Sequence, residues 1–339
     1  MVSSPAHAVS IAGASCAIRD LTVSYRVGGG EYPAVREVQL DIPAGEVTAV
    51  IGESGSGKTT LAMAMLNAVQ PPGRIVSGSV IYESAGDILA MNARRLRQVR
   101  GDQVSMVFQT AQNSLNPLKR VGSQVLDLAR SHGHKDSKAV LREAAGLCAR
   151  MSLNADRVLT SYQHELSGGM RQRVGIMLAL VLKPAVVLLD EPTTALDVLS
   201  QSEVLQILRD LQRERRFSAV LITHDMGVVA ELADRVAVMY AGRVVERGRT
   251  QQVLINPMHP YTRALIASIP RLTGDPSHGR ALPGLPPALT TIPRQGCVFR
   301  SRCPYHPPIA DTEVPELRNM DGDHWVACHL AGQLDDRGD

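Results

Sequence analysis

The chain has 339 residues, of which 44% are hydrophobic and 20% are charged. This composition excludes a disordered or fibrous chain, and the length predicts one large α/β domain with a substantial appendage. The 36 basic and 33 acidic residues give a formal net charge of +3, too near balance to indicate nucleic acid or an anionic lipid surface as a partner. The longest apolar run, residues 174–182, is far shorter than the roughly 20 residues that span a bilayer.

The two ends of the chain carry further compositional signals. The first 16 residues lack a basic start and an uninterrupted apolar stretch, so we expect no signal peptide and a cytoplasmic location. Five cysteines are too few for a disulfide scaffold, yet Cys297, Cys303 and Cys328 lie close together near the C-terminus. Their grouping requires an explanation of its own.

The N-terminal part predicts strands followed by a strand–loop–helix unit. Apolar and polar residues alternate between residues 20 and 50, interrupted at residues 28–30 and 43–45, which predicts antiparallel strands and turns. Residues 47–51 are a short, mostly apolar run that ends in a glycine-rich loop. Residues 60–69 are rich in helix formers and predict the helix that follows.

The middle of the chain predicts a helical insertion and then a return to a sheet. Residues 121–129 and 137–151 have helical patterns. Apolar runs at 186–189 and 219–222 each end at polar residues, as buried parallel strands do at their carboxyl ends, so we expect an open α/β sheet. Residues 270–293 contain six prolines and predict an extended linker to the cysteine-bearing tail.

Residues 52–59 carry a phosphate-binding motif. They fit G-x-x-x-x-G-K-[ST], in which backbone N–H groups and a helix N-terminus cradle phosphates, the lysine reaches the β- and γ-phosphates and the hydroxyl binds Mg²⁺. A flexible glycine turn is the alternative, but the position between a predicted strand and a predicted helix favours a phosphate loop. The predicted ATP-binding residues here are Gly52, Glu53, Ser54, Gly55, Ser56, Gly57, Lys58, Thr59 and Thr60.

Two adjacent acids follow the apolar residues 187–189. Asp190 can hold Mg²⁺ through water, and Glu191 can polarise an attacking water. The pair could instead cap a following helix. An apolar strand that ends in two acids is the arrangement that phosphoryl transfer needs.

A further segment carries a family resemblance: Leu166-Ser167-Gly168-Gly169-Met170, followed by Arg171-Gln172-Arg173, resembles the signature motif of ABC-type ATPases. Taken singly, a histidine or tyrosine is more often a packing or surface residue. Four other positions nevertheless match the family in its order along the chain: Tyr25 its adenine-stacking aromatic, Gln109 its Q-loop glutamine, Ala195-Leu196-Asp197 its D-loop and His224 its switch histidine.

The resemblance implies an α/β fold with a phosphate-loop (RecA-like) core, a mainly parallel sheet and an antiparallel β subdomain. A helical insertion is expected at about residues 110–168. Residues 1–16 would be an N-terminal tail, 17–268 the ABC nucleotide-binding domain and 269–339 the proline-rich linker with the cysteine-bearing C-terminal extension. The sequence contains no second phosphate loop, so one chain supplies one nucleotide-binding unit.

The implied active site is shared between two subunits. ATP lies between the Lys58 loop of one subunit and the Ser167 loop of the other in a head-to-tail dimer, so residues 166–170 act on the partner's nucleotide. Lys58, Glu191 as general base and His224 on the γ-phosphate are the expected catalytic residues. The expected Mg²⁺ ligands are Thr59, Gln109 and Asp190, and Gln109 also links the nucleotide to the permease through the helical insertion.

The branch of the family is indicated by residues 114–117, 259–265 and 282–284, which resemble the oligopeptide, dipeptide and nickel importer ATPases. This branch implies two transmembrane permease subunits, a sister ATPase or second copy, an extracytoplasmic solute-binding protein and no nucleic acid. The chain would lie peripherally on the cytoplasmic face of the inner or plasma membrane. Residues 110–113 depart from the usual aspartate-proline start, which indicates a divergent permease. Peptides are the first expectation for cargo, with nickel chelates, glycosides and opines as alternatives.

The C-terminal cysteines of that branch bind an iron–sulfur cluster. Cys297, Cys303-Pro304-Tyr305 and Val326-Ala327-Cys328-His329 resemble the pattern, but Ala310 stands where it would place the third cysteine. Three thiolates are one fewer than the usual cluster needs. The alternatives are a histidine as fourth ligand (His306, His324 or His329), Zn²⁺ held as Cys₃His, or three free thiols that bind nothing.

Three other functions compete with import. A soluble ABC ATPase acting on nucleic acid or ribosomes would normally show two fused nucleotide units, a long coiled coil or a strongly basic surface. An exporter ATPase is disfavoured by the importer-like residues from His259 onward. A regulatory subunit without catalysis is disfavoured because Lys58, Ser167, Glu191 and His224 are all present.

Overall fold

The structure, a computed structural model, describes residues 14–109, 115–193, 196–268 and 284–334. Four predicted features lie wholly or mainly outside these ranges: the N-terminal tail, residues 110–113 after the Q-loop, Ala195 of the D-loop and the linker predicted at 270–293, of which only residues 284–293 are described. Within the described ranges, no helix is both long enough and apolar enough to cross a bilayer.

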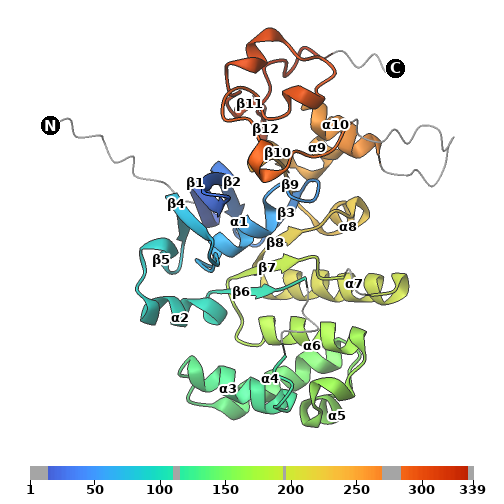
Figure 1. The fold of residues 1–339 in the computed structure, drawn as a ribbon. Coiled ribbons are helices and arrows are strands. Elements are labelled where there is room, and N and C mark those ends of the chain that lie inside the picture. The colour runs from blue at the N-terminus through green and yellow to red at the C-terminus, as the bar shows by residue number, and fades with distance from the viewer. Residues whose placement is uncertain (1–13, 110–114, 194–195, 269–283, 335–339) are drawn as a thin grey trace.

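The described residues form two sheets, which confirms the α/β core with an antiparallel β subdomain (Figure 1). The antiparallel sheet has the order β2-β1-β4-β5 and the main sheet the order β11-β12-β10-β9-β3-β8-β7-β6. From β9 to β6 the main sheet is parallel. The strands are β1 (Ala14–Val27), β2 (Gly30–Pro43), β3 (Val47–Ile51), β4 (Gly73–Tyr82), β5 (Gly86–Asp87), β6 (Val104–Val107), β7 (Val186–Asp190), β8 (Ser218–Ile222), β9 (Arg235–Tyr240), β10 (Arg243–Arg249), β11 (Arg318–Asp321) and β12 (His324–Val326).

Helices cover both faces of the main sheet and build the insertion. They are α1 (Lys58–Met65), α2 (Ala93–Asp102), α3 (Val121–Ser131), α4 (Ser137–Arg150), α5 (Ala155–Thr160), α6 (Gly168–Leu180), α7 (Val198–Arg215), α8 (Met226–Leu232), α9 (Thr250–Ile255) and α10 (Pro260–Ala267). Short 3₁₀ turns include η5 (Leu289–Thr291), η6 (Arg300–Arg302) and η7 (Pro308–Asp311).

The parallel strands are buried on both faces, and their side chains alternate between two cores. In β7, Val186 and Leu188 pack with α1 and the antiparallel sheet, whereas Val187 and Leu189 pack with α6 and α7. Successive side chains of a strand point to opposite faces, so a continuous apolar run supplies both cores at once. This explains why the sequence shows these strands as unbroken apolar runs.

Helix α1 differs from the predicted helix at 60–69 in both boundaries. It begins at Lys58, directly after Gly57, and ends at Met65. Asn67 has a left-handed backbone with φ of 50° and donates from its side-chain amide to the carbonyl of Ile88. Asparagine tolerates this conformation well, and a residue in it ends the helix although the next residues are helix formers.

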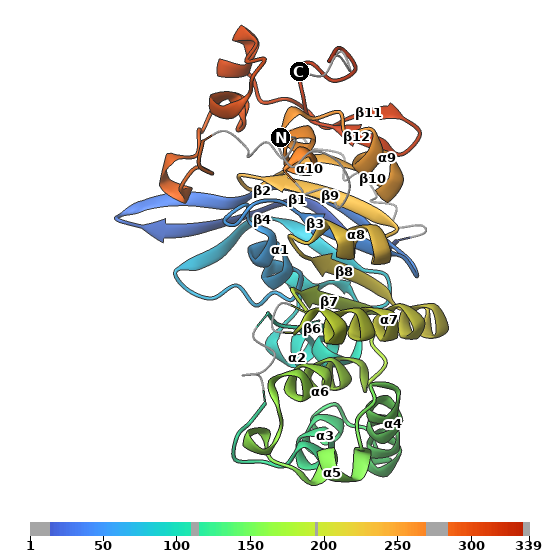
Figure 2. The same ribbon diagram turned by 90° about the vertical axis from the view of Figure 1, so that its right-hand side faces the viewer.

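The helical insertion lies at one end of the molecule and the C-terminal extension at the other (Figures 1 and 2). Helices α3, α4 and α5 pack around Val125, Ala144, Leu147 and Val158, all at most 1% exposed. In the extension, β12 pairs with β10 through Glu246–Val326 and Arg247–Trp325, and β11 pairs with β12. The described part of the extension therefore continues the main sheet.

Candidate active site

The phosphate-loop motif lies between β3 and α1, and two of its glycines are required by close backbone approach. Gly52 has φ of 147°, and a Cβ there would lie 2.2 Å from the carbonyl oxygen of Met239. Gly57 has φ of 102°, and a Cβ there would lie 2.4 Å from the carbonyl oxygen of Ala34. Gly57 also provides no side-chain cap for α1, so the first N–H groups of the helix remain available to a ligand.

Lys58 lies folded back onto this loop. Its ammonium donates to the carbonyl oxygens of Gly52 at 2.7 Å and Glu53 at 2.8 Å and to the Ser56 hydroxyl at 3.3 Å. The residue is 9% exposed, and this burial lowers the pKa of Lys58 while the carboxylates of Glu191 and Asp190 oppose the shift. A positive charge is thus held in the loop where an anionic ligand would meet it.

Asp190 ends β7 directly beside the loop. It is 3% exposed and accepts a hydrogen bond from the Thr59 hydroxyl. Burial raises the pKa of Asp190, and the Thr59 hydrogen bond partly offsets that rise. A hydroxyl and a carboxylate brought together in this way are oxygen donors of the kind that Mg²⁺ prefers.

Glu191 meets side chains from the carboxyl ends of two other parallel strands. Its Oε2 accepts from the Gln109 amide at 2.8 Å, and its Oε1 lies 3.0 Å from His224 Nδ1. Gln109 lies two residues after β6 and His224 two residues after β8. The Glu191 backbone is left-handed, with φ of 47°, and its N–H donates to the carbonyl of Ile222 at 2.9 Å. A non-glycine residue held in this sparsely populated region is typical of a site where geometry is imposed by its neighbours.

One cavity of about 460 Å³ collects most of the predicted residues. From the prediction it contains Tyr25, Gly52, Ser54, Gly55, Gly57, Lys58, Thr59, Thr60, Gln109, Glu191 and His224. Its lining also includes three residues that sequence reasoning missed: Ala34, Ile222 and Leu289. Leu289 comes from η5 in the C-terminal extension, and a lone leucine in a proline-rich segment gives no signal of such a position.

Other predicted residues lie outside this cavity. Glu53 and Ser56 are not among its lining residues, nor are Leu166, Ser167, Gly168, Gly169 and Met170. Ser167 caps α6 by accepting from the Met170 N–H at 3.3 Å, and Asp197 caps α7 by accepting from the Ser200 N–H at 3.0 Å. Within one subunit the signature segment is therefore separate from the phosphate loop.

Comparisons with known proteins agree with this geometry. The sequence profile of the ABC transporter family matches residues 35–194, and that of the oligopeptide/dipeptide transporter C-terminal region matches residues 245–309. The dipeptide transport ATP-binding protein DppD of Caldanaerobacter subterraneus subsp. tengcongensis is 45% identical over 92% of this chain and 96% of its own length. The chain belongs to the ABC transporter ATP-binding proteins.

Further relatives and solved structures of this ABC ATPase extend the match. The oligopeptide transport ATP-binding protein OppD of Bacillus subtilis is 38% identical over 92% of this chain and 88% of its own length. The dimeric cassette MJ0796, solved in a post-hydrolysis state with ADP and Pi, has a TM-score of 0.60 and 26% identity over 69% of this chain and 98% of its own. ABC transporter ATP-binding proteins hydrolyse ATP to drive transport, so the chain is an ATPase that uses ATP and Mg²⁺.

The described residues around the three C-terminal cysteines of this ABC ATPase do not support the expected iron–sulfur cluster. Cys297, Cys303 and Cys328 are half-buried, and burial raises the pKa of the Cys328 thiol to about 11. The position of the missing ligand is held by Ala310, which is 3% exposed and whose carbonyl accepts from the Cys297 N–H at 2.7 Å. No three His, Cys, Asp or Glu side chains in the described ranges are arranged to hold a metal. The donor set does not fit a four-thiolate cluster.

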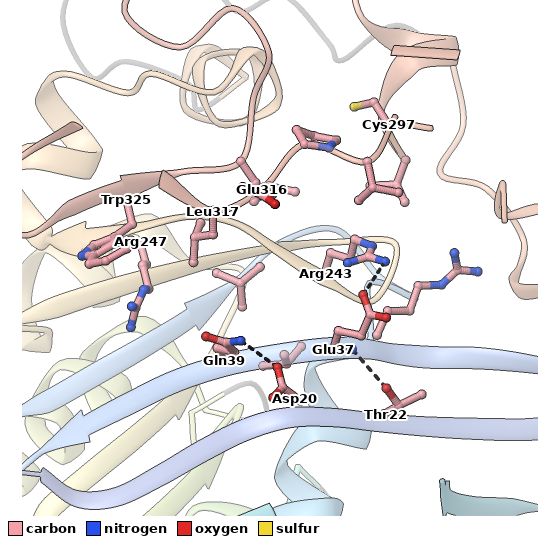
Figure 3. A pocket seen from close by; sticks show the side chains of 18 of the residues that line it. Asp20, Thr22, Glu37, Gln39, Arg243, Arg247, Cys297, Glu316, Leu317 and Trp325 are labelled. Carbon is pink, nitrogen blue, oxygen red and sulfur yellow. Dashed lines mark hydrogen bonds and ion pairs between the residues drawn. The ribbon is translucent and has the colours of Figure 1, made fainter. Parts of the chain in front are cut away.

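A second, larger cavity of about 750 Å³ lies between β2 and the C-terminal extension (Figure 3). Two pairs of its polar side chains are hydrogen-bonded: Gln39 donates to Asp20 at 2.6 Å, and Arg243 to Glu37 at 3.0 Å. The guanidinium of Arg247 lies over the Trp325 ring at 5.0 Å. Except for Cys297, none of the predicted site residues lines this cavity, so it is distinct from the phosphate-loop site.

Proposed function

We propose that the chain is the ATP-hydrolysing subunit of a membrane importer for peptides or a related small solute. The observation that carries the chemistry is the cavity in which Lys58, Glu191 and His224 come together from three segments of the chain. The cargo class is supported by the relatives, which are named dipeptide and oligopeptide transport ATP-binding proteins and are similar over nine-tenths of the chain. Those names favour transport over the alternative of a soluble ATPase acting on nucleic acid.

In this proposal the phosphates of ATP bind over residues 52–60, and the adenine stacks on Tyr25. Lys58 exchanges its contacts with the loop carbonyl oxygens for contacts with the β- and γ-phosphates. The unpaired N–H groups at the start of α1 supply further donors, and their dipole favours the negative charge. These roles follow from the position of the side chains around one cavity.

The residues for Mg²⁺ would be Thr59, Asp190 and Gln109. The Thr59 hydroxyl already contacts Asp190, and Gln109 lies across the cavity on Glu191. Mg²⁺ held by these residues would offset the negative charge that develops on the phosphate oxygens. Asp190 is buried beside Lys58, so its carboxylate is positioned before nucleotide arrives.

Hydrolysis is proposed to depend on Glu191 as general base. Its carboxylate contacts Gln109 and His224, and the residue lines the cavity. It would accept a proton from the water that attacks the γ-phosphate. The side chain of His224 is 68% exposed, which leaves it free to contact the γ-phosphate as the dimer closes.

The signature segment is proposed to act on the nucleotide of a partner subunit. Residues 166–170 lie outside the subunit's own cavity, and Ser167 starts α6 with N–H groups suited to a phosphate. Asp197 would lie at the same dimer interface. The partner is a sister ATPase or a second copy. The domain boundaries at 17–268 and 269–339 belong to the same proposal.

The remaining partners are proposed from the relatives. Two transmembrane permeases would receive the helical insertion, and an extracytoplasmic solute-binding protein would deliver the cargo. The chain would then lie on the cytoplasmic face of the membrane. No metal centre at the cysteines is part of this proposal, because Ala310 replaces a required ligand.

The test of transport is uptake of a labelled dipeptide and a labelled oligopeptide by proteoliposomes that contain the permeases, both ATPase subunits and the binding protein. We expect ATP-dependent uptake that is lost with Lys58→Met. A matched Lys183→Met variant changes a lysine that does not line the cavity and should transport normally. ATP hydrolysis without uptake of either peptide would contradict the peptide assignment while leaving the ATPase intact.

A further inference from the structure

The second residue of the phosphate loop is held by the C-terminal extension. Glu53 pairs with Arg302 through two hydrogen bonds, at 2.6 Å to Oε2 and 3.0 Å to Oε1. The Arg302 side chain is 5% exposed and that of Glu53 20% exposed. A bidentate guanidinium–carboxylate ion pair with little solvent exposure is stronger than a single-contact pair, and it fixes the orientation of both groups as well as the distance between them.

The same loop residue has a second anchor on α10. The Glu53 N–H donates to the Tyr261 hydroxyl at 2.8 Å. Tyr261 is fully buried against Tyr240 and Phe299, with ring centroids 4.6 Å and 5.5 Å away. Both the backbone and the side chain of Glu53 are therefore hydrogen-bonded to residues that lie between β10 and β11 in the chain.

Arg302 is itself held in place. Its guanidinium lies 5.7 Å from the centre of the Tyr240 ring and donates to the Gly284 carbonyl at 3.3 Å. It belongs to η6, directly before Cys303. The extension thus presents a preoriented cation to the phosphate loop.

We propose that Arg302 is a positioning residue for the phosphate-binding loop, through which the C-terminal extension sets nucleotide affinity. The Glu53 carbonyl accepts from the Lys58 ammonium at 2.8 Å. The residue that Arg302 holds in place therefore also fixes the position of the Lys58 ammonium in the absence of nucleotide. Arg302 touches neither the cavity nor the expected phosphates. The inference rests on the proposed ATP binding at this loop.

Loss of the Arg302–Glu53 contact should weaken ATP binding, because the phosphate loop must then be ordered when ATP binds. Ordering about one residue corresponds to roughly a tenfold rise in the dissociation constant. A purely electrostatic role gives a different pattern. If charge alone mattered, Glu53→Gln would remove a negative charge near the phosphates and tighten binding, and Arg302→Lys would change little.

The experiment measures ATP dissociation constants of the full-length chain by calorimetry for Arg302→Lys, Arg302→Met, Glu53→Gln and the Arg302→Lys/Glu53→Gln double variant. Positioning predicts that each single variant weakens ATP binding and that the double variant is no weaker than Arg302→Lys alone, because both changes break one contact. Thermal unfolding midpoints of the variants without nucleotide show whether a variant has lost only the Arg302–Glu53 contact or is unfolded. If Arg302→Met does not fold, the two conservative variants still decide.

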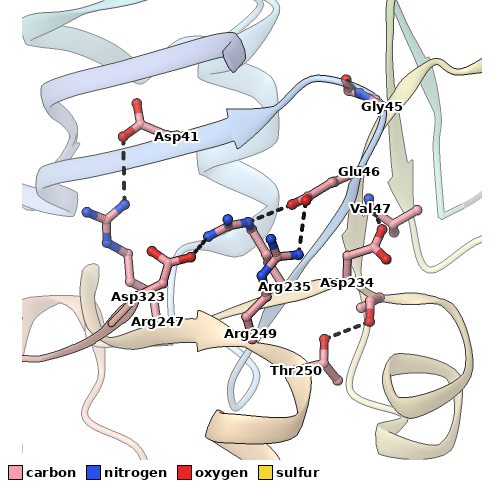
Figure 4. Close-up of polar contacts among 12 residues, drawn as sticks. Asp41, Gly45, Glu46, Val47, Asp234, Arg235, Arg247, Arg249, Thr250 and Asp323 are labelled. Atoms are coloured by element: carbon pink, nitrogen blue, oxygen red, sulfur yellow. Dashed lines mark hydrogen bonds and ion pairs between the residues drawn. The ribbon is translucent and has the colours of Figure 1, made fainter. Parts of the chain in front are cut away.

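The matched control breaks another contact between extension and core. Asp323, in the turn between β11 and β12, pairs with Arg235, which also pairs with Glu46 at 2.6 Å (Figure 4). Glu46 precedes β3, whereas the phosphate loop follows it, so the two contacts lie roughly 15 Å apart along the strand. Asp323→Asn should leave ATP affinity unchanged.

Two results would overturn the inference. One is wild-type ATP affinity in the Arg302 variants, and the other is an equal loss in Asp323→Asn, which would mean that any loosening of the extension matters. Failure of the unaltered chain to bind ATP would instead contradict the proposed function.

Discussion

We expect the folded protein to lose stability in mild acid because His259 is buried without charge. It is 1% exposed at the start of α10, and its Nδ1 accepts from the Tyr261 N–H at 3.0 Å. Burial lowers the pKa of His259 to about 4, although the nearby Glu246 carboxylate opposes the shift. Because protonation would place a charge in this core and remove the acceptor of the cap, the folded state resists the proton that the unfolded chain binds.

The magnitude follows from the two pKa values. The unfolded histidine titrates near 6.5 and the folded one near 4, so the contribution is present above pH 6.5 and is lost as the pH falls towards 4. At pH 5 the free energy of unfolding should be lower than at pH 7.5 by about 2 kcal/mol from this group alone.

The assay is urea unfolding, followed by circular dichroism, at pH 7.5 and pH 5.0. His259→Asn keeps an N-cap side chain but cannot be protonated in this range, so its fall in stability should be smaller than that of the unaltered chain by about 2 kcal/mol. His164→Asn replaces an exposed histidine and should behave as the unaltered chain does. Equal falls for His259→Asn and the unaltered chain would mean that His259 is not the group whose protonation destabilises the fold.

Two further predictions concern the loop and the insertion. Gly57→Ala should weaken ATP binding by at least about tenfold in calorimetry. The new Cβ would lie 2.4 Å from the carbonyl oxygen of Ala34, in a backbone with φ of 102°. An affinity equal to that of the unaltered chain would contradict this loop geometry. Leu147→Ala should lower the free energy of unfolding of the insertion by about 2–5 kcal/mol in hydrogen exchange, because the side chain is 1% exposed in its core. ATP affinity should stay unchanged, since Leu147 does not line the cavity.

The strand–loop–helix unit could be predicted because its requirements are local. Gly52 and Gly57 are fixed by backbone conformations that other residues rarely adopt, and Lys58 follows at a fixed spacing. Strand β7 and the acids Asp190 and Glu191 at its end could be predicted for the same reason, since an unbroken apolar run indicates a strand buried on both faces. Parallel topology then brought Gln109, Glu191 and His224 to one edge of the sheet.

The C-terminal extension could not be predicted in the same way. Strand β11 has the sequence RNMD, which lacks an apolar alternation, and β12 is three residues long. Strand β12 pairs with β10, about 80 residues earlier in the chain, and β11 pairs with β12, so neither strand leaves a local pattern in the sequence. The contact of Arg302 with Glu53 spans 249 residues and was likewise invisible in the sequence.

We propose that this chain hydrolyses ATP with Glu191 as the general base. The measurement that tests it most directly is ATP hydrolysis by the complete membrane complex with Glu191→Gln, beside Glu83→Gln, which changes an exposed glutamate that does not line the cavity. We expect that Glu191→Gln abolishes steady hydrolysis while ATP still binds, and that Glu83→Gln hydrolyses ATP at the unaltered rate. Unchanged hydrolysis with Glu191→Gln would mean that Glu191 is not the general base and that the partner's ATP site carries out the chemistry.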